Sequence, residues 1–219
     1  MRSPDCLTRA CVACHAFPCS SVGRLNKFLS NSRPGRSQTS FLWKGCNMAY
    51  IMVDIESDGP IPHDYSMVCL GAVIVDEILD RTFYGKLKPI SDRWIPEALQ
   101  VSGFTREETL QFDDPSAVIK EFNDWIVKNS KGQPLFISDN NGFDWQFVNY
   151  YFHHFLGGNP FGHSSTNLGS LYKGLVKDTF QNFKHLRKTT HTHNPLDDAK
   201  GNAEALLYMK QELGLQMRL

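Results

Sequence analysis

Four acidic residues and one histidine stand at three separate places in the chain where their side chains could bind divalent metal ions. Asp54 and Glu56 lie in an apolar run, Asp144 follows a second apolar run, and His193 precedes Asp198 near the end of the chain. Carboxylate oxygens are the ligands that Mg²⁺ and Mn²⁺ prefer, and bound divalent ions promote the attack of water on a phosphodiester. These residue types make a nuclease the leading functional hypothesis.

The first acidic pair belongs to a predicted strand over residues 50–55, which is rich in Ile, Val and Tyr and is followed by Gly-Pro. Side chains alternate across a strand, so Asp54 and Glu56 fall on the same face. Two carboxylates on one face repel each other unless a cation lies between them. The simpler interpretation is a strand end with two solvated acids, and a D-x-E triplet alone favours it.

Asp144 is preceded by a predicted buried strand over residues 134–138 and a tight loop over 139–142, and a predicted helix over 145–155 follows it. An acid at the start of a helix is often only an N-cap. Its position at the carboxyl end of a strand is also where α/β folds build their sites.

The third group lies at the start of a predicted helix over residues 196–213. Asp198 falls in the first turn, and His193 falls in the loop before it. A histidine beside a metal-bound water can accept its proton near neutral pH. His191 and Asp197 are competing choices for the base and the ligand, and spacing alone excludes neither.

Taken together, the three groups resemble the motifs of the DEDDh (DnaQ-like) 3′→5′ exonucleases. The D-x-E, N-x-x-F-D and H-x-x-x-x-D-A patterns of that family are matched in order by Asp54 and Glu56, by Asn140, Phe143 and Asp144, and by His193, Asp198 and Ala199. The stretch 95–107 is similar to the family's A-x-x-V-H-G-I-T-x-E segment. The family spacing selects His193 and Asp198 over His191 and Asp197.

Two residues depart from the family pattern. Ser57 replaces the usual Thr after the first Glu, and Asp139 replaces a frequent His before the Asn. Ser57 keeps a hydroxyl group. Asp139 adds an acid near the site, which could alter substrate contacts without abolishing metal binding.

The resemblance implies a mechanism and a set of site residues. Asp54, Glu56, Asp144 and Asp198 are expected to hold two divalent cations, Mg²⁺ or Mn²⁺, and His193 is expected to act as the base. The expected reaction releases nucleoside 5′-monophosphates from the 3′ end of single-stranded nucleic acid. The expected substrate contacts are Ser57, Phe104, Asn140 and Phe143.

The order of predicted elements agrees with this family's fold. Three successive strands come first, and alternating helices and strands follow, with a looser region over 157–192 before the last helix. The predicted strands are 50–55, 67–76, 79–88 and 134–138, and the predicted helices are 115–128, 145–155 and 196–213. This order suits an α/β fold with a mixed sheet and helices on both faces. By resemblance it is the RNase H-like exonuclease fold.

The chain has 219 residues and a formal net charge of zero, but its charge is unevenly distributed. Residues 1–47 carry seven basic residues and one acid, which leaves 16 basic and 22 acidic residues for 48–219. Bound divalent ions would offset the acids of the site. The basic stretch 173–193 leads into the His193 motif and could follow a nucleic-acid backbone, although a solvated helix face explains it equally well.

The first 47 residues form a basic, Ser-rich extension that contains most of the cysteines: Cys6, Cys11, Cys14, Cys19 and Cys46. Haem attachment, a zinc cluster and an organelle transit peptide each match part of its pattern. We expect instead that residues 1–47 lie upstream of the true start, because Lys44-Gly45 must be encoded by a purine run like a bacterial ribosome-binding site. The exonuclease domain is then 48–219, beginning at Met48.

Substrate, location and assembly are also predicted. We expect RNA slightly ahead of DNA as the substrate. We expect no membrane attachment, because no apolar run is long enough to cross a membrane. We expect a cytoplasmic location, because Cys69 is the one cysteine in 48–219. Stand-alone relatives commonly form homodimers. A competing hypothesis is a vestigial binding module on the same fold, which expects at least one motif acid to be lost.

Overall fold

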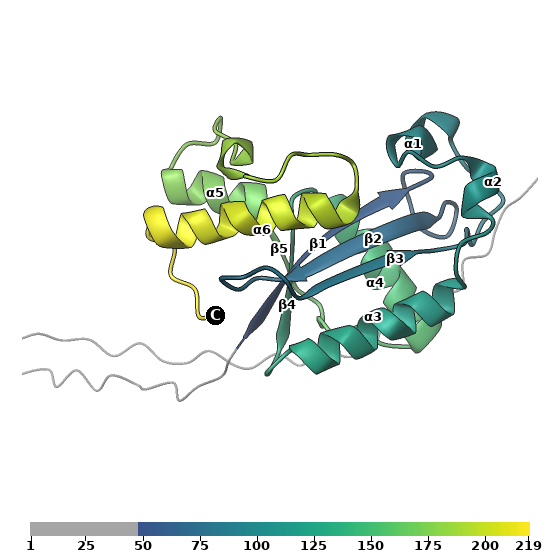
Figure 1. Ribbon diagram of the computed structural model, residues 1–219, viewed down its shortest axis with the longest axis horizontal. Coiled ribbons are helices and arrows are strands. Elements are labelled where there is room, and N and C mark those ends of the chain that lie inside the picture. Colours follow the sequence, from purple (N-terminus) through teal and green to yellow (C-terminus); the bar gives the residue numbers. More distant parts are fainter. Residues whose placement is uncertain (1–47) are drawn as a thin grey trace, which may run out of the picture. The chain divides into compact units, whose positions relative to one another are not determined.

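The computed structural model describes residues 48–219, in which one sheet organises the helices. The sheet order is β3-β2-β1-β4-β5, so β1 is the central strand (Figure 1). β1 pairs antiparallel with β2 and parallel with β4, β2 pairs antiparallel with β3, and β4 pairs parallel with β5. The predicted mixed sheet is therefore confirmed. The strands are β1 (Ala49–Ser57), β2 (Met67–Ile74), β3 (Thr82–Lys86), β4 (Pro134–Ser138) and β5 (Ser165–Asn167).

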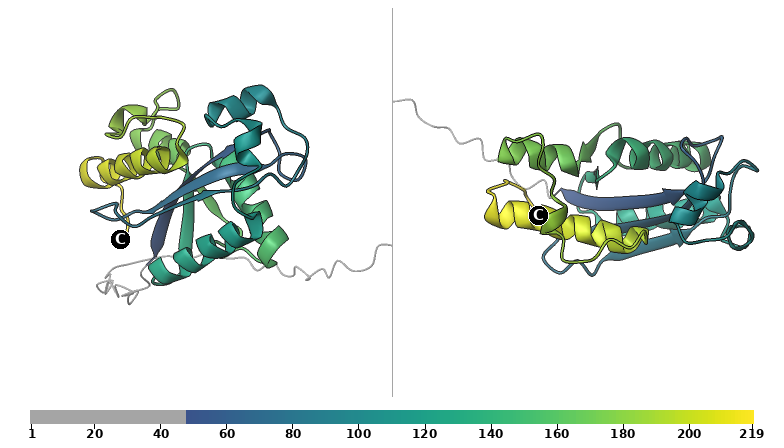
Figure 2. Two further views of the ribbon diagram at one scale, coloured as in Figure 1. Left: turned by 45° about the vertical axis from the view of Figure 1, so that its right-hand side comes forward. Right: turned by 90° about the horizontal axis from the view of Figure 1, so that it is seen from above.

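Helices cover both faces of this sheet (Figure 2). α3 (Pro115–Asn129) and α4 (Asn141–Leu156) supply side chains to one buried core, and α5 (Leu168–Val176) and α6 (Pro195–Glu212) supply them to the other. The sheet is thus the middle layer of three, as predicted for an RNase H-like exonuclease fold.

Alternation along β1 decides which face receives the acids. Val53 belongs to the core that α3 and α4 cover, whereas Met52 belongs to the core that α5 and α6 cover. Asp54 and Glu56 alternate in step with Met52. Both carboxylates therefore lie on the face where α6 packs.

The region 157–192 is more ordered than predicted. It contains β5, α5 and a short 3₁₀ helix, η1 (Lys184–Leu186), so the expectation of a loose segment was wrong. The strand β5 has only polar residues, and its backbone pairs with β4 from Phe136 to Ser138. A strand of this kind is stabilised by its backbone pairing, which no apolar period in the sequence reveals.

Other element boundaries also differ from the predictions. The stretch 95–107 forms the short helix α1 (Pro96–Val101) and the start of a second, α2 (Arg106–Thr109). β3 begins at Thr82 rather than residue 79, because the carboxylate of Asp76 accepts hydrogen bonds from the backbone of Ile78 and Leu79 and forms a turn there.

Two predictions concern what lies around this domain. No helix within residues 48–219 is both long and apolar enough to cross a membrane. The predicted extension over 1–47, with its cysteines, lies outside the described residues.

Candidate active site

The first turn of α6 lies directly on the sheet beside Asp54. Asp54 pairs with Gly71 across β1 and β2, and a side chain at Gly71 would overlap the backbone of Pro195 and Leu196. Paired residues of antiparallel strands point to the same face, so the missing side chain leaves the space that α6 fills. Asn194 caps the helix by accepting a hydrogen bond from the Leu196 amide.

This packing brings three carboxylates together. One ligand oxygen each of Asp54, Glu56 and Asp198 lies within 4.8 Å of the others, and these three residues are called the carboxylate cluster below. Asp198 is 2% exposed, whereas Asp54 and Glu56 are half-buried. The structure thus brings together three of the four predicted metal ligands, as the strand alternation and the family motifs required.

Asp144 reaches the same end of the sheet from the opposite layer. β4 runs parallel to β1, so the helix that follows it, α4, begins near the carboxyl end of β1. Asp144 is 2% exposed, and its Oδ2 is buried without a hydrogen-bond partner. An unsatisfied buried carboxylate oxygen is costly unless a cation or water completes it.

The electrostatics confirm that these acids crowd one another. Removal from water, followed by the negative charges of Asp144, Glu56 and Asp198, raises the pKa of Asp54 well above its ordinary value. Removal from water and the charge of Asp198 raise the pKa of Glu56 to about 7. Burial raises the pKa of Asp144 to about 8. Each shift means that burial, together with the neighbouring acids, disfavours the ionised form of these carboxyl groups.

The residues present fit a divalent metal ion. In the part of the chain that the structure describes, no Lys or Arg forms an ion pair with Asp54, Glu56, Asp144 or Asp198. Converging carboxylates, an orphaned oxygen on Asp144 and an all-oxygen donor set are what a hard divalent cation requires.

Residues 188–194, called the histidine loop below, wrap around the Asp198 carboxylate. The backbone amides of Thr192 and His193 donate to its two oxygens at 3.2 and 3.1 Å. His193 has a φ of 59°, a left-handed conformation uncommon for a residue other than glycine. Its Nδ1 lies 3.7 Å from Oε1 of Glu56, so the predicted base faces the carboxylate cluster.

The predicted substrate contacts divide into two groups. Ser57 and Phe143 line a cavity of about 430 Å³ that also contains Glu56. Phe104 lies elsewhere, against Phe112 and the Lys86 ammonium group. Asn140 is exposed at the N-cap of α4, where its carbonyl accepts from the amides of Phe143 and Asp144. The Ser57 hydroxyl donates to the carbonyl of Gly59, so it also stabilises the turn after β1.

Two residues near the site, Gly71 and Arg187, were given no role from the sequence, and His191 was considered only as a competing base. Gly71 permits the close packing of α6, His191 places Nδ1 at 2.7 Å from Oδ1 of Asp198, and Arg187 pairs with Asp139 at 3.1 Å. The unusual Asp139 was noticed, but its basic partner was not assigned. The basic run that contains Arg187 was the signal that could have identified it.

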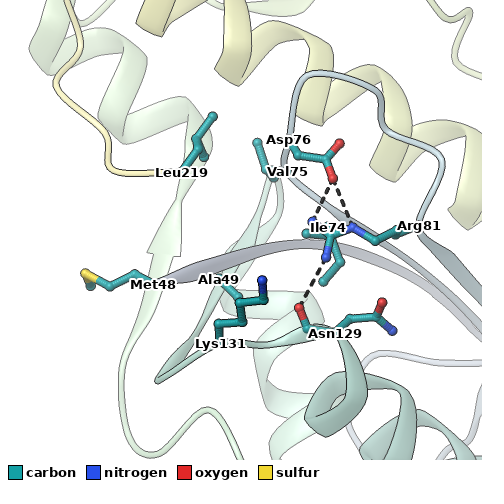
Figure 3. A pocket seen from close by; sticks show the side chains of 9 residues that line it. All are labelled: Met48, Ala49, Ile74, Val75, Asp76, Arg81, Asn129, Lys131 and Leu219. Carbon is teal, nitrogen blue, oxygen red and sulfur yellow. Dashed lines mark hydrogen bonds and ion pairs between the residues drawn. The ribbon is translucent and has the colours of Figure 1, made fainter. Parts of the chain in front are cut away.

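A different cavity lies at the opposite end of β1, away from the acids (Figure 3). It measures about 220 Å³, and its lining includes Met48, Lys131 and Leu219. The one acidic side chain among the described residues of its lining, Asp76, is already paired with Arg81 at 2.7 Å. This cavity therefore lacks the grouped ligands that distinguish the carboxylate cluster.

The fold and the grouped acids, which could bind metal ions, define a nuclease of the DEDDh type, and comparison with known proteins agrees. The family model Exonuclease (RNase_T) matches residues 51–206. The chain is 36% identical over 166 residues to Cap18 of Escherichia coli, a 3′-5′ DNA exonuclease, covering 71% of this chain and 88% of Cap18. The chain belongs to this exonuclease family.

Solved structures share the fold at low sequence identity. E. coli Exonuclease I, in a zinc-bound complex with single-stranded DNA, is 17% identical with a TM-score of 0.60 over 77% of this chain, which spans only 42% of Exonuclease I. The nuclease domain of 3′hExo, a DEDDh family member bound to rAMP, is 16% identical with a TM-score of 0.60, over 78% of this chain and 96% of that domain. The RNase H-like exonuclease fold is therefore confirmed, and the chain is a 3′→5′ exonuclease.

Proposed function

We propose that this exonuclease removes nucleotides from the 3′ end of single-stranded nucleic acid, with two Mg²⁺ or Mn²⁺ ions, and releases nucleoside 5′-monophosphates. The convergence of Asp54, Glu56 and Asp198 beside Asp144 and His193 carries this proposal. A vestigial binding module would be expected to lack at least one of these groups, and all five are present.

The proposed metal ligands are Asp54, Glu56 and Asp198, with Asp144 supporting a second ion. When bound, such ions lower the pKa of a coordinated water and offset charge on the phosphate and the departing 3′ oxygen. Nδ1 of His193 faces the Glu56 carboxylate. A proton on Nδ1 would be stabilised there, which leaves Nε2 free to accept the proton of the attacking water.

The cavity beside Glu56 supports a site for the terminal nucleotide. Its lining is largely apolar and includes Ile95, Ala98 and Val101 of the 95–107 segment together with Phe143. A base can stack on an aromatic ring without regard to sequence. We assign the capture of the terminal nucleotide to Phe143 and Ser57. Phe104 and Asn140 stay predictions as substrate contacts.

A basic surface supports a path for the rest of the strand. A cavity of about 250 Å³ is lined by Lys184, Arg187, Lys188, Thr189, Thr190 and His191. Lysine and arginine side chains contact phosphates irrespective of sequence. This surface includes His191, two residues from His193, so it lies beside the proposed base. Among the described residues, its two lysines are the free cations, because the Arg187 side chain is buried against Asp139.

For the sugar, we propose DNA as the preferred substrate. The relative with 36% identity, Cap18, is a DNA exonuclease and is aligned over most of its length. The earlier preference for RNA is untested, and no side chain of the site identifies a partner for a 2′-hydroxyl. Equal cleavage of both sugars would reject this proposal without affecting the exonuclease assignment.

The test uses the full chain with 5′-labelled single-stranded DNA and RNA oligonucleotides, with Mg²⁺ or Mn²⁺. A ladder that shortens from the 3′ end, absent with EDTA and in Asp54→Asn, is the expected result. Phe143→Ala should raise KM more than it lowers kcat, since it removes a binding surface. Bound Mn²⁺ with no shortening of either strand would contradict the proposed reaction.

Three further properties stay predictions. Homodimerisation can be tested by light scattering of the purified chain. A cytoplasmic location can be tested by fractionating the source cells. The domain start at Met48 can be tested by N-terminal sequencing of the native protein, where a start at Met1 would reject it.

A further inference from the structure

His191 forms a second ligand group with two residues of the proposed active site. One ligand atom each of His191, His193 and Asp198 lies within 4.8 Å of the others. Nδ1 of His191 is 2.7 Å from Oδ1 of Asp198, and the two imidazole rings are 4.3 Å apart between centroids. His191 is not part of the family motif that identified His193 and Asp198.

The group combines one fixed ligand with two accessible ones. Asp198 is 2% exposed, and the amides of Thr192 and His193 hold its carboxylate in place. The side chains of His191 and His193 are 49% and 50% exposed, so an ion from solvent can reach their nitrogens. Glu204 further supports the loop, because it accepts hydrogen bonds from the backbone of Lys188 and Thr189.

The donor atoms of this group differ in kind from those of the carboxylate cluster. Two imidazole nitrogens and one carboxylate oxygen favour Zn²⁺, Ni²⁺ or Cu²⁺, whereas Mg²⁺ and Mn²⁺ favour oxygen alone. A tetrahedral zinc ion with bonds of about 2.0–2.2 Å separates its ligand atoms by roughly 3.4 Å. The close contact between His191 Nδ1 and Asp198 Oδ1 would have to open slightly, and the half-exposed ring can make that movement.

We propose that His191, His193 and Asp198 form a site for Zn²⁺ and similar transition-metal ions, and that its occupation inhibits the exonuclease. The zinc site and the proposed catalytic group share His193 and Asp198. A zinc ion bound to either imidazole nitrogen of His193 leaves the ring proton on the other nitrogen, so His193 has no lone pair with which to accept a proton. The ion also withdraws Asp198 from the carboxylate cluster. The inhibition rests on the proposed function, whereas the zinc binding does not.

Calorimetric titration of the full chain with Zn²⁺ and, separately, with Mn²⁺ tests the binding. His191→Ala should weaken Zn²⁺ binding at least about tenfold and leave Mn²⁺ binding close to its original strength. Asp54→Asn should do the reverse. His191→Cys should retain Zn²⁺, since a thiolate is also a zinc ligand. The exposed His163 provides a matched control, and His163→Ala should change neither titration.

Activity then tests the inhibition. With saturating Mg²⁺, the Zn²⁺ concentration that halves the rate should rise at least about tenfold in His191→Ala, relative to that variant's own zinc-free rate. Zinc affinity that depends on Asp54 and not on His191 would overturn the site. Zinc binding that depends on His191 without any inhibition would overturn the regulatory part alone. Absence of exonuclease activity without zinc would instead contradict the proposed function.

Discussion

The carboxylate cluster and the histidine loop meet at Asp198, but they are built in different ways. Asp54 and Glu56 stand on the central strand, and Asp198 stands on a helix packed against that strand. The histidine loop has no regular structure between η1 and α6, and its two imidazoles are half-exposed. Rigid elements position ligands more accurately than loops do. The difference suggests that metal binding depends on packing, whereas proton transfer depends on one side chain.

The largest effect should come from Asp54→Asn, which keeps the shape of the side chain and removes its charge. We expect activity to fall by at least about 10³-fold, above the cost of losing a single electrostatic donor. The metal-free variant should unfold at a higher temperature than the original protein, because removing one of several mutually repelling carboxylates relieves repulsion. Activity assays and thermal unfolding with EDTA check both parts. A lower unfolding temperature would show that Asp54 has another structural role.

His193→Asn tests the histidine loop separately from the carboxylate cluster. It removes the proposed base without touching the carboxylate cluster, so we expect kcat to fall by about 10²–10³-fold while Mn²⁺ affinity changes little. Single-turnover kinetics and calorimetry separate these two quantities. If Mn²⁺ binding were lost together with activity, His193 would be a metal ligand and not a base.

Gly71→Ala tests whether packing alone positions the cluster. The added methyl group would overlap the start of α6, so we expect a loss of about 1–3 kcal/mol in unfolding free energy. Displacing Asp198 should also lower activity by about tenfold to 10²-fold. Gly174→Ala in α5, where an added Cβ meets nothing within 4 Å, is the matched control and should be neutral or stabilising. Full activity in Gly71→Ala would show that α6 can shift without affecting the site.

Some features of the site could be predicted from the sequence, and others could not. The shared face of Asp54 and Glu56 follows from strand alternation, and the motif spacing distinguished His193 from His191. The role of Gly71 depends on the register between β1 and β2, which no residue spacing encodes. β5 was missed because its polar residues have no apolar period. The position of Phe104 within its motif likewise does not determine which neighbours its ring packs against.

The smallest expected effect is the pH dependence of stability, which should differ between the metal-free and the metal-bound protein. The pKa of Glu56 is raised to about 7 in the folded protein, so the folded state holds this proton more tightly than the unfolded chain does. The free energy of unfolding of the metal-free protein should therefore decrease as pH rises from the ordinary carboxyl range through about 7.

A bound divalent ion offsets this loss of stability at higher pH, because it favours the ionised carboxylates. The increase in unfolding temperature that Mn²⁺ produces should consequently be larger at pH 8 than at pH 6. Thermal unfolding with and without Mn²⁺ at both pH values measures the difference, and Asp54→Asn should show little increase at either. An Mn²⁺ effect of equal size at both pH values would mean that the crowded carboxylates do not control metal binding, and the exposed histidines of the loop would then be the remaining candidates.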